Sequence, residues 1–239
     1  MQSTDAQQTT PTSHQTSPDA IVQAWRAMGV TTMEELAARV CELTVAQAAP
    51  RRVPLDLDSV LRETPSELAR TLTHRPMQHT VIVDGCETAD LQHYNGQPLH
   101  YVMSTDTMKG APVIAYSRLA ELKAHIHETL GASDQGLIGT SDPDAFTPTC
   151  FFYDDINYEG NVKSLEPGTW YPDLTRVTRN VSWQDWNDVI SSLAQSRSLR
   201  IAWEHINEQG SAFVFHAGVG GSLVDVGWND VISSIMNVG

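Results

Sequence analysis

Residues 186–192 read Trp-Asn-Asp-Val-Ile-Ser-Ser, and residues 228–234 read the same seven letters. An exact heptapeptide repeat in a chain of 239 residues indicates that one structural unit occurs twice. The repeated side chains include an amide, a carboxylate and two hydroxyls, which are oxygen donors that a hard cation such as Ca²⁺ prefers. The repeat therefore predicts a duplicated unit with a candidate cation site in each copy.

A second repeat precedes each heptapeptide. Residues 153–160 read Tyr-Asp-Asp-Ile-Asn-Tyr-Glu-Gly, and residues 203–210 read Trp-Glu-His-Ile-Asn-Glu-Gln-Gly. Both begin with an aromatic residue and an acid, carry Ile-Asn in the middle and end on Gly. A strand that folds back sharply needs a residue that tolerates positive φ, and Gly does so freely. The pattern predicts a folded hairpin in each unit, with the aromatic ring lying across it.

The two patterns together resemble the βγ-crystallin signature, in which an aromatic residue, six further residues and Gly precede Asn/Asp-Asn/Asp-x-x-Ser/Thr-Ser. Two such motifs run from about Cys150 to Gly239, or about 38% of the chain (90 of 239 residues). The resemblance implies two Greek-key motifs packed as one β-sandwich. For the microbial members it also implies that the Asn/Asp-rich stretches are calcium clamps, and that the two clamps donate ligands to each other's site.

The predicted ligands of the two Ca²⁺ ions are oxygen atoms, since Ca²⁺ takes roughly six to eight oxygens from carboxylates, carbonyls, amides and water. The resemblance adds the backbone carbonyl of the residue after each hairpin aromatic, and it gives the last serines, Ser192 and Ser234, a structural role against the hairpin. Which member of each Asn-Asp pair contacts the ion stays open at this point. The full predicted set is Asp154, Asn187, Asp188, Val189, Ser191, Glu204, Asn229, Asp230, Val231 and Ser233.

A metal-free reading of the same residues stays open. Asn-Asp clusters are common turn formers because their side chains bond to local backbone, and many lens crystallins keep the fold without good calcium sites. Both heptapeptides retain every oxygen donor, which favours calcium binding. The small number of carboxylates in each site predicts a modest affinity.

Composition and charge exclude several classes of protein. The chain has 29 acidic and 15 basic residues, a net charge of −14, which argues against binding to nucleic acid or to anionic membrane surfaces. Three widely spaced cysteines, Cys41, Cys86 and Cys150, give no disulfide framework. The polar N-terminus lacks the apolar run of a signal peptide. We expect a cytoplasmic location by default, with non-classical export open and the compartment unknown.

Residues 1–149, which precede the crystallin-like motifs, show no resemblance to a known family. Residues 1–16 have the low complexity of a disordered tail. Residues 17–130 are predicted to form short helices, with N-caps at Ser17, Thr32 and Thr64, and then a small α+β unit. That unit has strands at 79–83, 99–104 and 112–116 and a helix at 117–130, and residues 131–149 are predicted to be a linker. The fold class is therefore multidomain: a helical and α+β part, with an unknown protein partner, followed by an all-β domain.

No catalytic residue or organic cofactor is predicted, and the chain is expected not to be an enzyme. GxSxG, phosphate-loop and HExxH motifs are absent from the sequence. His125 and His127 are two residues apart, so on a helix they point away from each other. A pair between Cys86 and a neighbouring histidine (His79, His93 or His100) is chemically conceivable, but an ordinary cysteine near unrelated histidines is favoured.

Three functions follow from these patterns. The first is a calcium-binding βγ-crystallin-type protein with a stress- or assembly-related role. The second is a protease inhibitor or toxin-like protein on the same fold, which the absence of paired cysteines disfavours. The third is an enzyme with its chemistry in residues 77–130. We expect the first.

Overall fold

The computed structural model describes residues 32, 49–53, 57–136, 148–179 and 184–238, with side chains of 132–136 excepted. The chain divides into two compact units, Met1–Ala46 and Gln47–Gly239. Nearly all described residues belong to the second unit. The predicted tail at 1–16 and the predicted helices that follow Ser17 and Thr32 lie outside the described residues.

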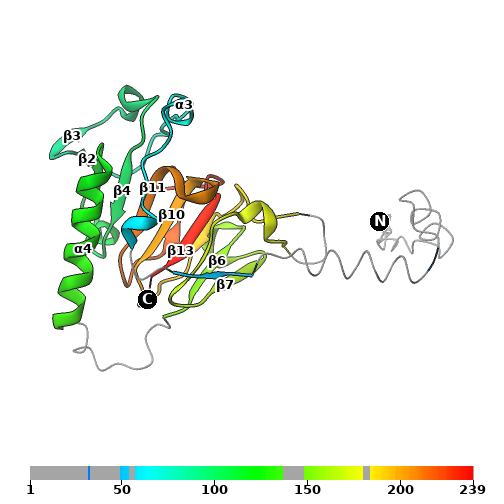
Figure 1. Ribbon diagram of the computed structural model, residues 1–239. Coiled ribbons are helices and arrows are strands. Elements are labelled where there is room, and N and C mark those ends of the chain that lie inside the picture. The colour runs from blue at the N-terminus through cyan, green and yellow to red at the C-terminus, as the bar shows by residue number, and fades with distance from the viewer. Residues whose placement is uncertain (1–31, 33–48, 54–56, 137–147, 180–183, 239) are drawn as a thin grey trace, which may run out of the picture. The chain divides into compact units, whose positions relative to one another are not determined.

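Two β-sheets form the second unit (Figure 1). In spatial order, the nine-stranded sheet consists of β1 (Arg51–Arg52), β8 (Thr169–Tyr171), β13 (Ser234–Asn237), β10 (Arg200–His205), β11 (Gln209–Phe215), β4 (His100–Met103), β5 (Val113–Tyr116), β2 (Val81–Val83) and β3 (Cys86–Thr88). The four-stranded sheet consists of β12 (Gly221–Ser222), β9 (Ser192–Leu193), β6 (Cys150–Tyr153) and β7 (Val162–Leu165).

Helices are few in the described chain. The α-helices are α3 (Ser66–Ala69) and α4 (Leu119–Gly136), and short 3-10 turns are η1 (Leu57–Ser59), η2 (Leu91–Tyr94), η3 (Thr107–Lys109), η4 (Ile156–Tyr158), η5 (Leu174–Arg176) and η6 (Ile206–Glu208). Within the described ranges, none of the helices is both long and apolar enough to cross a membrane.

The two repeats exchange their third strands. The first repeat supplies β6, β7 and β9 to the four-stranded sheet but places β8 in the other sheet, next to β13. The second repeat supplies β10, β11 and β13 to the nine-stranded sheet but places β12 beside β9. Each sheet therefore needs a strand from both repeats, and the predicted sandwich of two Greek keys is present.

The α+β residues continue the crystallin-type sheet instead of forming a sheet of their own. Strand β4 pairs in parallel with β11, with Tyr101 opposite Phe213 and Met103 opposite Phe215. Strand β1 covers the other edge by pairing with β8. The prediction set residues 17–130 apart from the sandwich, whereas the structure joins residues 47–239 in one unit. An uncovered β11 would present seven residues of unpaired backbone, and pairing with β4 removes that exposed edge.

The central strands of the nine-stranded sheet are buried on both faces, whereas its edge strands β1 and β3 are largely exposed. Along β11, Phe213 and Phe215 point into the sandwich core, whereas Ala212 and Val214 pack on the outer face with Leu122 and other residues of α4. Strands buried on both faces contain near-continuous apolar runs, such as Ala-Phe-Val-Phe at 212–215. The sequence thus carried a signal for the covering helix, although the prediction did not use it.

The local predictions for residues 64–130 agree with the structure in part. Strands expected at 79–83, 99–104 and 112–116 are found as β2, β4 and β5. The helix expected to end before Gly131 continues to Gly136, and the helix expected after Thr64 is the single turn α3. Strand β3 was not predicted. Of the predicted linker, residues 137–147 lie outside the described residues.

Helix α4 is attached to the sheet through a pair of histidines. His125 Nε2 lies 2.9 Å from His216 Nε2 at the end of β11, and His125 Nδ1 lies 3.2 Å from the Tyr116 hydroxyl. His127 instead faces Asp58, at 3.5 Å, so the prediction that His125 and His127 diverge is confirmed. Burial, together with the neighbouring His125, lowers the pKa of His216 to about 4. Burial also lowers the pKa of His125, against the opposing charge of Glu128.

This lowered pKa predicts acid sensitivity. Between about pH 6.5, where an unfolded histidine titrates, and about pH 4, where His216 titrates when folded, the unfolded chain binds a proton that the folded chain does not. The free energy of unfolding therefore falls as the pH drops through this window. We expect His216→Gln to reduce that loss by on the order of 1 kcal/mol, because the pair is partly exposed and screened.

Urea unfolding at pH 7 and pH 5 measures how much free energy of unfolding is lost between the two pH values. The control is His127→Gln on α4, the helix that also carries His125. Burial also lowers the pKa of His100 to about 4, so the stability of the variant will still depend partly on pH. An unchanged difference between the two pH values in His216→Gln would contradict the role given to the His125–His216 pair.

Candidate metal centre

Each repeat contains a folded hairpin built on left-handed backbone. Asn157 and Asn207, at the centres of η4 and η6, have φ of 59° and 57°. The glycines that end the hairpins, Gly160 and Gly210, have φ of 76° and 83°, a region that residues with a Cβ rarely adopt. A Cβ at Gly210 would also lie 2.9 Å from the His205 ring. The predicted reason for these glycines is confirmed.

The last serine of each heptapeptide fixes its hairpin. Ser192 Oγ donates to the Asp155 carbonyl at 2.7 Å and accepts from Tyr158 N at 3.1 Å. Ser234 Oγ donates to the His205 carbonyl at 2.9 Å. Both serines are fully buried. Their hydroxyls are therefore committed to the hairpins, as the family resemblance implied.

The two heptapeptide loops, here called clamp 1 (187–192) and clamp 2 (229–234), are joined by reciprocal backbone hydrogen bonds. Asp188 N donates to the Ile232 carbonyl at 3.1 Å, and Asp230 N donates to the Ile190 carbonyl at 3.2 Å. Both acids have left-handed φ, 52° and 55°. This arrangement directs the carboxylate of each clamp toward the serine of the other.

Two clusters of oxygen atoms result. In site 1, Ser191 Oγ lies 2.9 Å from the Asp154 carbonyl and 3.4 Å from Asp230 Oδ1, with the Val189 carbonyl at 3.5 Å. In site 2, Ser233 Oγ lies 2.8 Å from the Glu204 carbonyl and 3.0 Å from Asp188 Oδ1. Each site therefore combines a hairpin carbonyl, a hydroxyl and a carboxylate from the opposite clamp.

The structure separates the two members of each Asn-Asp pair, which the sequence could not do. The aspartates reach the oxygen clusters, whereas Asn187 Nδ2 donates to Asp188 Oδ2 at 2.7 Å. Asn229 Nδ2 donates in the same way to Asp230 Oδ2 at 2.6 Å. The two amides orient the carboxylates. Val231, the counterpart of Val189, lines a cavity next to site 2.

The donor set fits a hard divalent cation. The Oδ1 atoms of Asn187 and Asn229 are buried without a hydrogen-bond partner, so acceptor oxygens are left unsatisfied beside both clusters. Burial raises the pKa of Asp188, against hydrogen bonds from Ser233 and Asn187 that lower it, as expected of a carboxylate removed from water. Among the described residues, no cluster of three or more His, Cys, Asp or Glu could hold a metal. Each oxygen cluster combines one carboxylate with a hydroxyl and a carbonyl, which is the mixed, largely neutral donor set that Ca²⁺ accepts.

The side chains of the two hairpin acids are occupied elsewhere, which leaves their carbonyls for the sites. Asp154 Oδ2 pairs with Arg179 Nη1 at 2.8 Å and accepts from Asn161 Nδ2 at 2.6 Å. Glu204 Oε2 accepts from Ser211 N at 3.1 Å. This agrees with the implied role of both residues as carbonyl donors.

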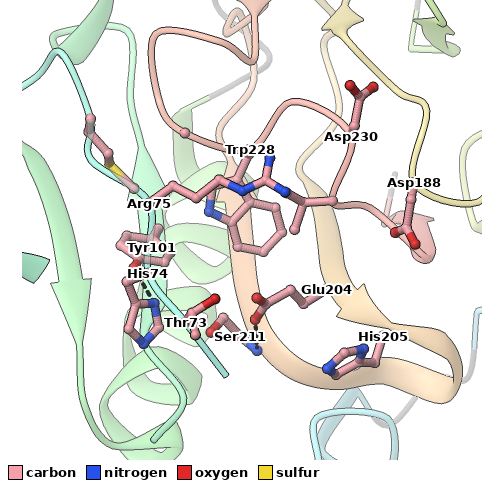
Figure 2. A pocket seen from close by; sticks show the side chains of 13 residues that line it. Thr73, His74, Arg75, Tyr101, Asp188, Glu204, His205, Ser211, Trp228 and Asp230 are labelled. Atoms are coloured by element: carbon pink, nitrogen blue, oxygen red, sulfur yellow. Dashed lines mark hydrogen bonds between the residues drawn. The ribbon is translucent and has the colours of Figure 1, made fainter. Parts of the chain in front are cut away.

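A cavity of about 200 Å³ opens beside site 2 (Figure 2). Its walls come from both repeats, the first through Asp188, and from the N-terminal part of the unit, including Arg75 and Tyr101. Figure 2 shows Arg75 extended across the cavity toward the loop that carries Trp228 and Asp230. Sequence reasoning missed this contribution of residues 73–77, because the close approach of chain segments so far apart in sequence leaves no local pattern.

The Cys-His pair considered from the sequence does not assemble. Cys86 is exposed on β3, His93 faces Asp90 at 3.7 Å, and buried His100 accepts from Ala212 N through Nδ1. The cavity lining does not include Cys86. The described residues thus give no support to a Cys-His nucleophile in residues 77–130.

Solved βγ-crystallin domains match a share of the chain similar in size to the stretch that holds the two motifs. A domain from Clostridium beijerinckii, a double mutant, is 30% identical over 36% of this chain and 92% of its own, with a TM-score of 0.29. A domain from Flavobacterium johnsoniae is 28% identical over 38% and 93%, with a TM-score of 0.30. An archaeal βγ-crystallin is 22% identical over 38% and 96%, with a TM-score of 0.30.

Through residues 150–239, this chain belongs to the βγ-crystallin superfamily. The doubled signature, the folded hairpins and the exchanged third strands all lie in the βγ-crystallin part. The expected family is therefore confirmed. No family model matches the chain, and no curated protein matches it.

The serine-to-hairpin bonds predict a specific loss of stability. We expect Ser192→Ala to lower the free energy of unfolding by about 1–3 kcal/mol, because the Tyr158 N–H and the Asp155 carbonyl lose their buried partner. Urea unfolding measures the change. Ser164→Ala, an exposed serine on β7 of the same sheet, is the control and should stay within about 0.5 kcal/mol of the parent. Equal effects of the two changes would contradict the assigned role.

Proposed function

We propose that the βγ-crystallin domain binds two Ca²⁺ ions, one in site 1 and one in site 2, and that the ions stabilise the sandwich. The observation that carries the proposal is the reciprocal placement of Asp188 beside Ser233 and of Asp230 beside Ser191. Either ion would contact residues of both repeats. Calcium would therefore cross-link the two Greek keys, and no catalytic step is assigned to the domain.

The energetic consequence follows from mass action. A ligand that binds only the folded state stabilises it by RT ln(1 + [L]/Kd), or about 2.7 kcal/mol at a hundredfold excess over Kd. With one carboxylate reaching each cluster, the affinity should be modest, since ligand charge is one determinant of calcium affinity. The protein would then respond to large changes in calcium, in keeping with a stress- or assembly-related role.

We expect an arginine in place of a serine ligand to abolish the binding of one ion. Ser191→Arg removes a donor oxygen from site 1 and places a cation there, and Ser233→Arg does the same in site 2. We expect calorimetric titration of the full chain to count two Ca²⁺ ions in the parent and one in each variant. The full chain is needed because β4 pairs with β11. Ser164→Arg on exposed β7 is the control for the added charge.

The outcome that contradicts the proposal is a parent chain whose melting temperature does not change in millimolar calcium. The domain would then have a structural role without the ion. A parent that binds two ions, together with variants that fold by circular dichroism and still bind two, would instead show that Ser191 and Ser233 are wrongly assigned as ligands.

Cross-donation gives a sharper prediction. Asp230 belongs to clamp 2 but lies beside Ser191 of site 1, so Asp230→Asn should weaken the ion of site 1 by roughly tenfold through the loss of a charged ligand. In a Ser191→Arg background it should have little further effect on the remaining ion. In a Ser233→Arg background it should weaken the remaining ion by the full factor. The reverse pattern would mean that each clamp binds its own ion.

A further inference from the structure

The segment 72–78, here called the strap, crosses from the α+β part of the unit to clamp 2. On one side, the Leu72 carbonyl accepts from Gly96 N at 2.9 Å, and His74 N donates to Asn95 Oδ1 at 2.9 Å. The His74 ring lies 2.9 Å from both the Gln97 carbonyl and the Tyr101 hydroxyl. The strap is therefore attached to β4, through Tyr101, and to the residues that precede this strand.

Its other side is attached to the loop that enters clamp 2. Gln78 N donates to the Asp225 carbonyl at 2.8 Å, and Arg75 Nη1 donates to the Asn229 carbonyl at 2.6 Å. Gly227, with φ of 68°, permits this approach, since a Cβ there would lie 3.0 Å from the Pro76 carbonyl. The residue that corresponds to Gly227 in the first repeat is Asp185. The strap thus distinguishes two loops that are otherwise duplicates.

The charges around the cavity explain what the strap contributes. Three carboxylates line it, those of Asp188, Glu204 and Asp230, and the guanidinium of Arg75 lines it too. Together these four groups carry a net charge of −2. Asp188 lies beside Ser233 of site 2, so Arg75 offsets part of the negative charge around the cavity that opens beside this site (Figure 2).

We infer that Arg75 makes site 2 the weaker of the two calcium sites, and that calcium at site 2 and docking of the strap oppose each other. This inference rests on the proposed binding of Ca²⁺ by the clamps. Arg75 and an ion at site 2 are like charges near the same carboxylates, so each raises the free energy of the other. Arg75 is exposed, and solvent screens its charge, so the effect is a change in affinity and not an exclusion of the ion.

By thermodynamic linkage, the opposition between Arg75 and calcium at site 2 acts in both directions. If Arg75 lowers the affinity of site 2 for calcium by some factor, calcium lowers the equilibrium constant for docking of Arg75 by the same factor. Calcium at site 2 would loosen the contacts of Arg75 and Gln78 with the clamp 2 loop. In site 1, Arg179 bonds to the Asp154 side chain within the same repeat, and Asp230 is the ligand of this site that also lines the cavity.

Calorimetric titration of the full chain with CaCl₂ tests the inference with three variants. Arg75→Gln removes the charge and should tighten the weaker of two binding steps by on the order of tenfold, leaving the other step unchanged. Arg75→Lys keeps the charge and should stay close to the parent. Arg70→Gln, which removes the same charge from the exposed C-cap of α3, controls for net charge. An Arg75→Gln variant that leaves both steps unchanged overturns the inference.

Hydrogen exchange provides a second readout that does not depend on the substitution. The amide of Gln78 donates to Asp225 across the strap contact, so calcium should raise its exchange rate in the parent and raise it less in Arg75→Gln. Slower exchange with calcium in the parent would overturn the inference, because calcium would then tighten the strap. A parent that binds no calcium would overturn the proposed function and the inference with it, whereas two bound ions with an inert Arg75 would overturn the inference alone.

Discussion

The reciprocal hydrogen bonds between Asp188 and Ile232 and between Asp230 and Ile190 connect the two loops on which the rest of the βγ-crystallin domain depends. They require left-handed backbone at both acids, which an aspartate tolerates better than most residues. With the loops joined in this way, the first serine of each heptapeptide faces a hairpin carbonyl and a carboxylate from the other repeat. The candidate ion sites are therefore a consequence of the duplication, and neither repeat could form its site alone.

The nine-stranded sheet is more deeply buried than the four-stranded sheet, and the duplication does not explain this difference. Strands β6 and β7 bury one face and expose part of the other, whereas β11 and β13 are buried almost throughout. The additional burial comes from β4, which extends the sheet, and from α4, which covers its outer face. The N-terminal part of the chain thus extends the nine-stranded sheet at both edges, through β4 beside β11 and β1 beside β8. The strap follows the same asymmetry, since it contacts clamp 2.

Much of the βγ-crystallin domain could be predicted because its determinants form short repeated motifs. The glycine of each hairpin is required by the local backbone. The two serines of each heptapeptide bond to hairpin residues 29 or 37 positions away, but they stand in a motif that occurs twice, so the sequence shows them directly. The joining of β4 to β11 could not be predicted in the same way, because residues 112 positions apart leave no periodic pattern. The apolar run at 212–215 indicated that a further layer covers the sheet, but not that α4 provides it. Arg75 and His216 were missed for the same reason: their partners are distant in sequence.

The parallel pairing of β4 with β11 also bears on how the chain is synthesised. Paired residues of the two strands are 112 positions apart, so at about 5–20 residues per second the ribosome takes roughly 5–20 s to supply the partner of β4. During that interval the backbone of β4 facing β11 has no strand beside it, and such unpaired edges favour aggregation of nascent chains. Protection of this nascent edge, for example by a chaperone, would therefore determine how much of the chain reaches its folded state.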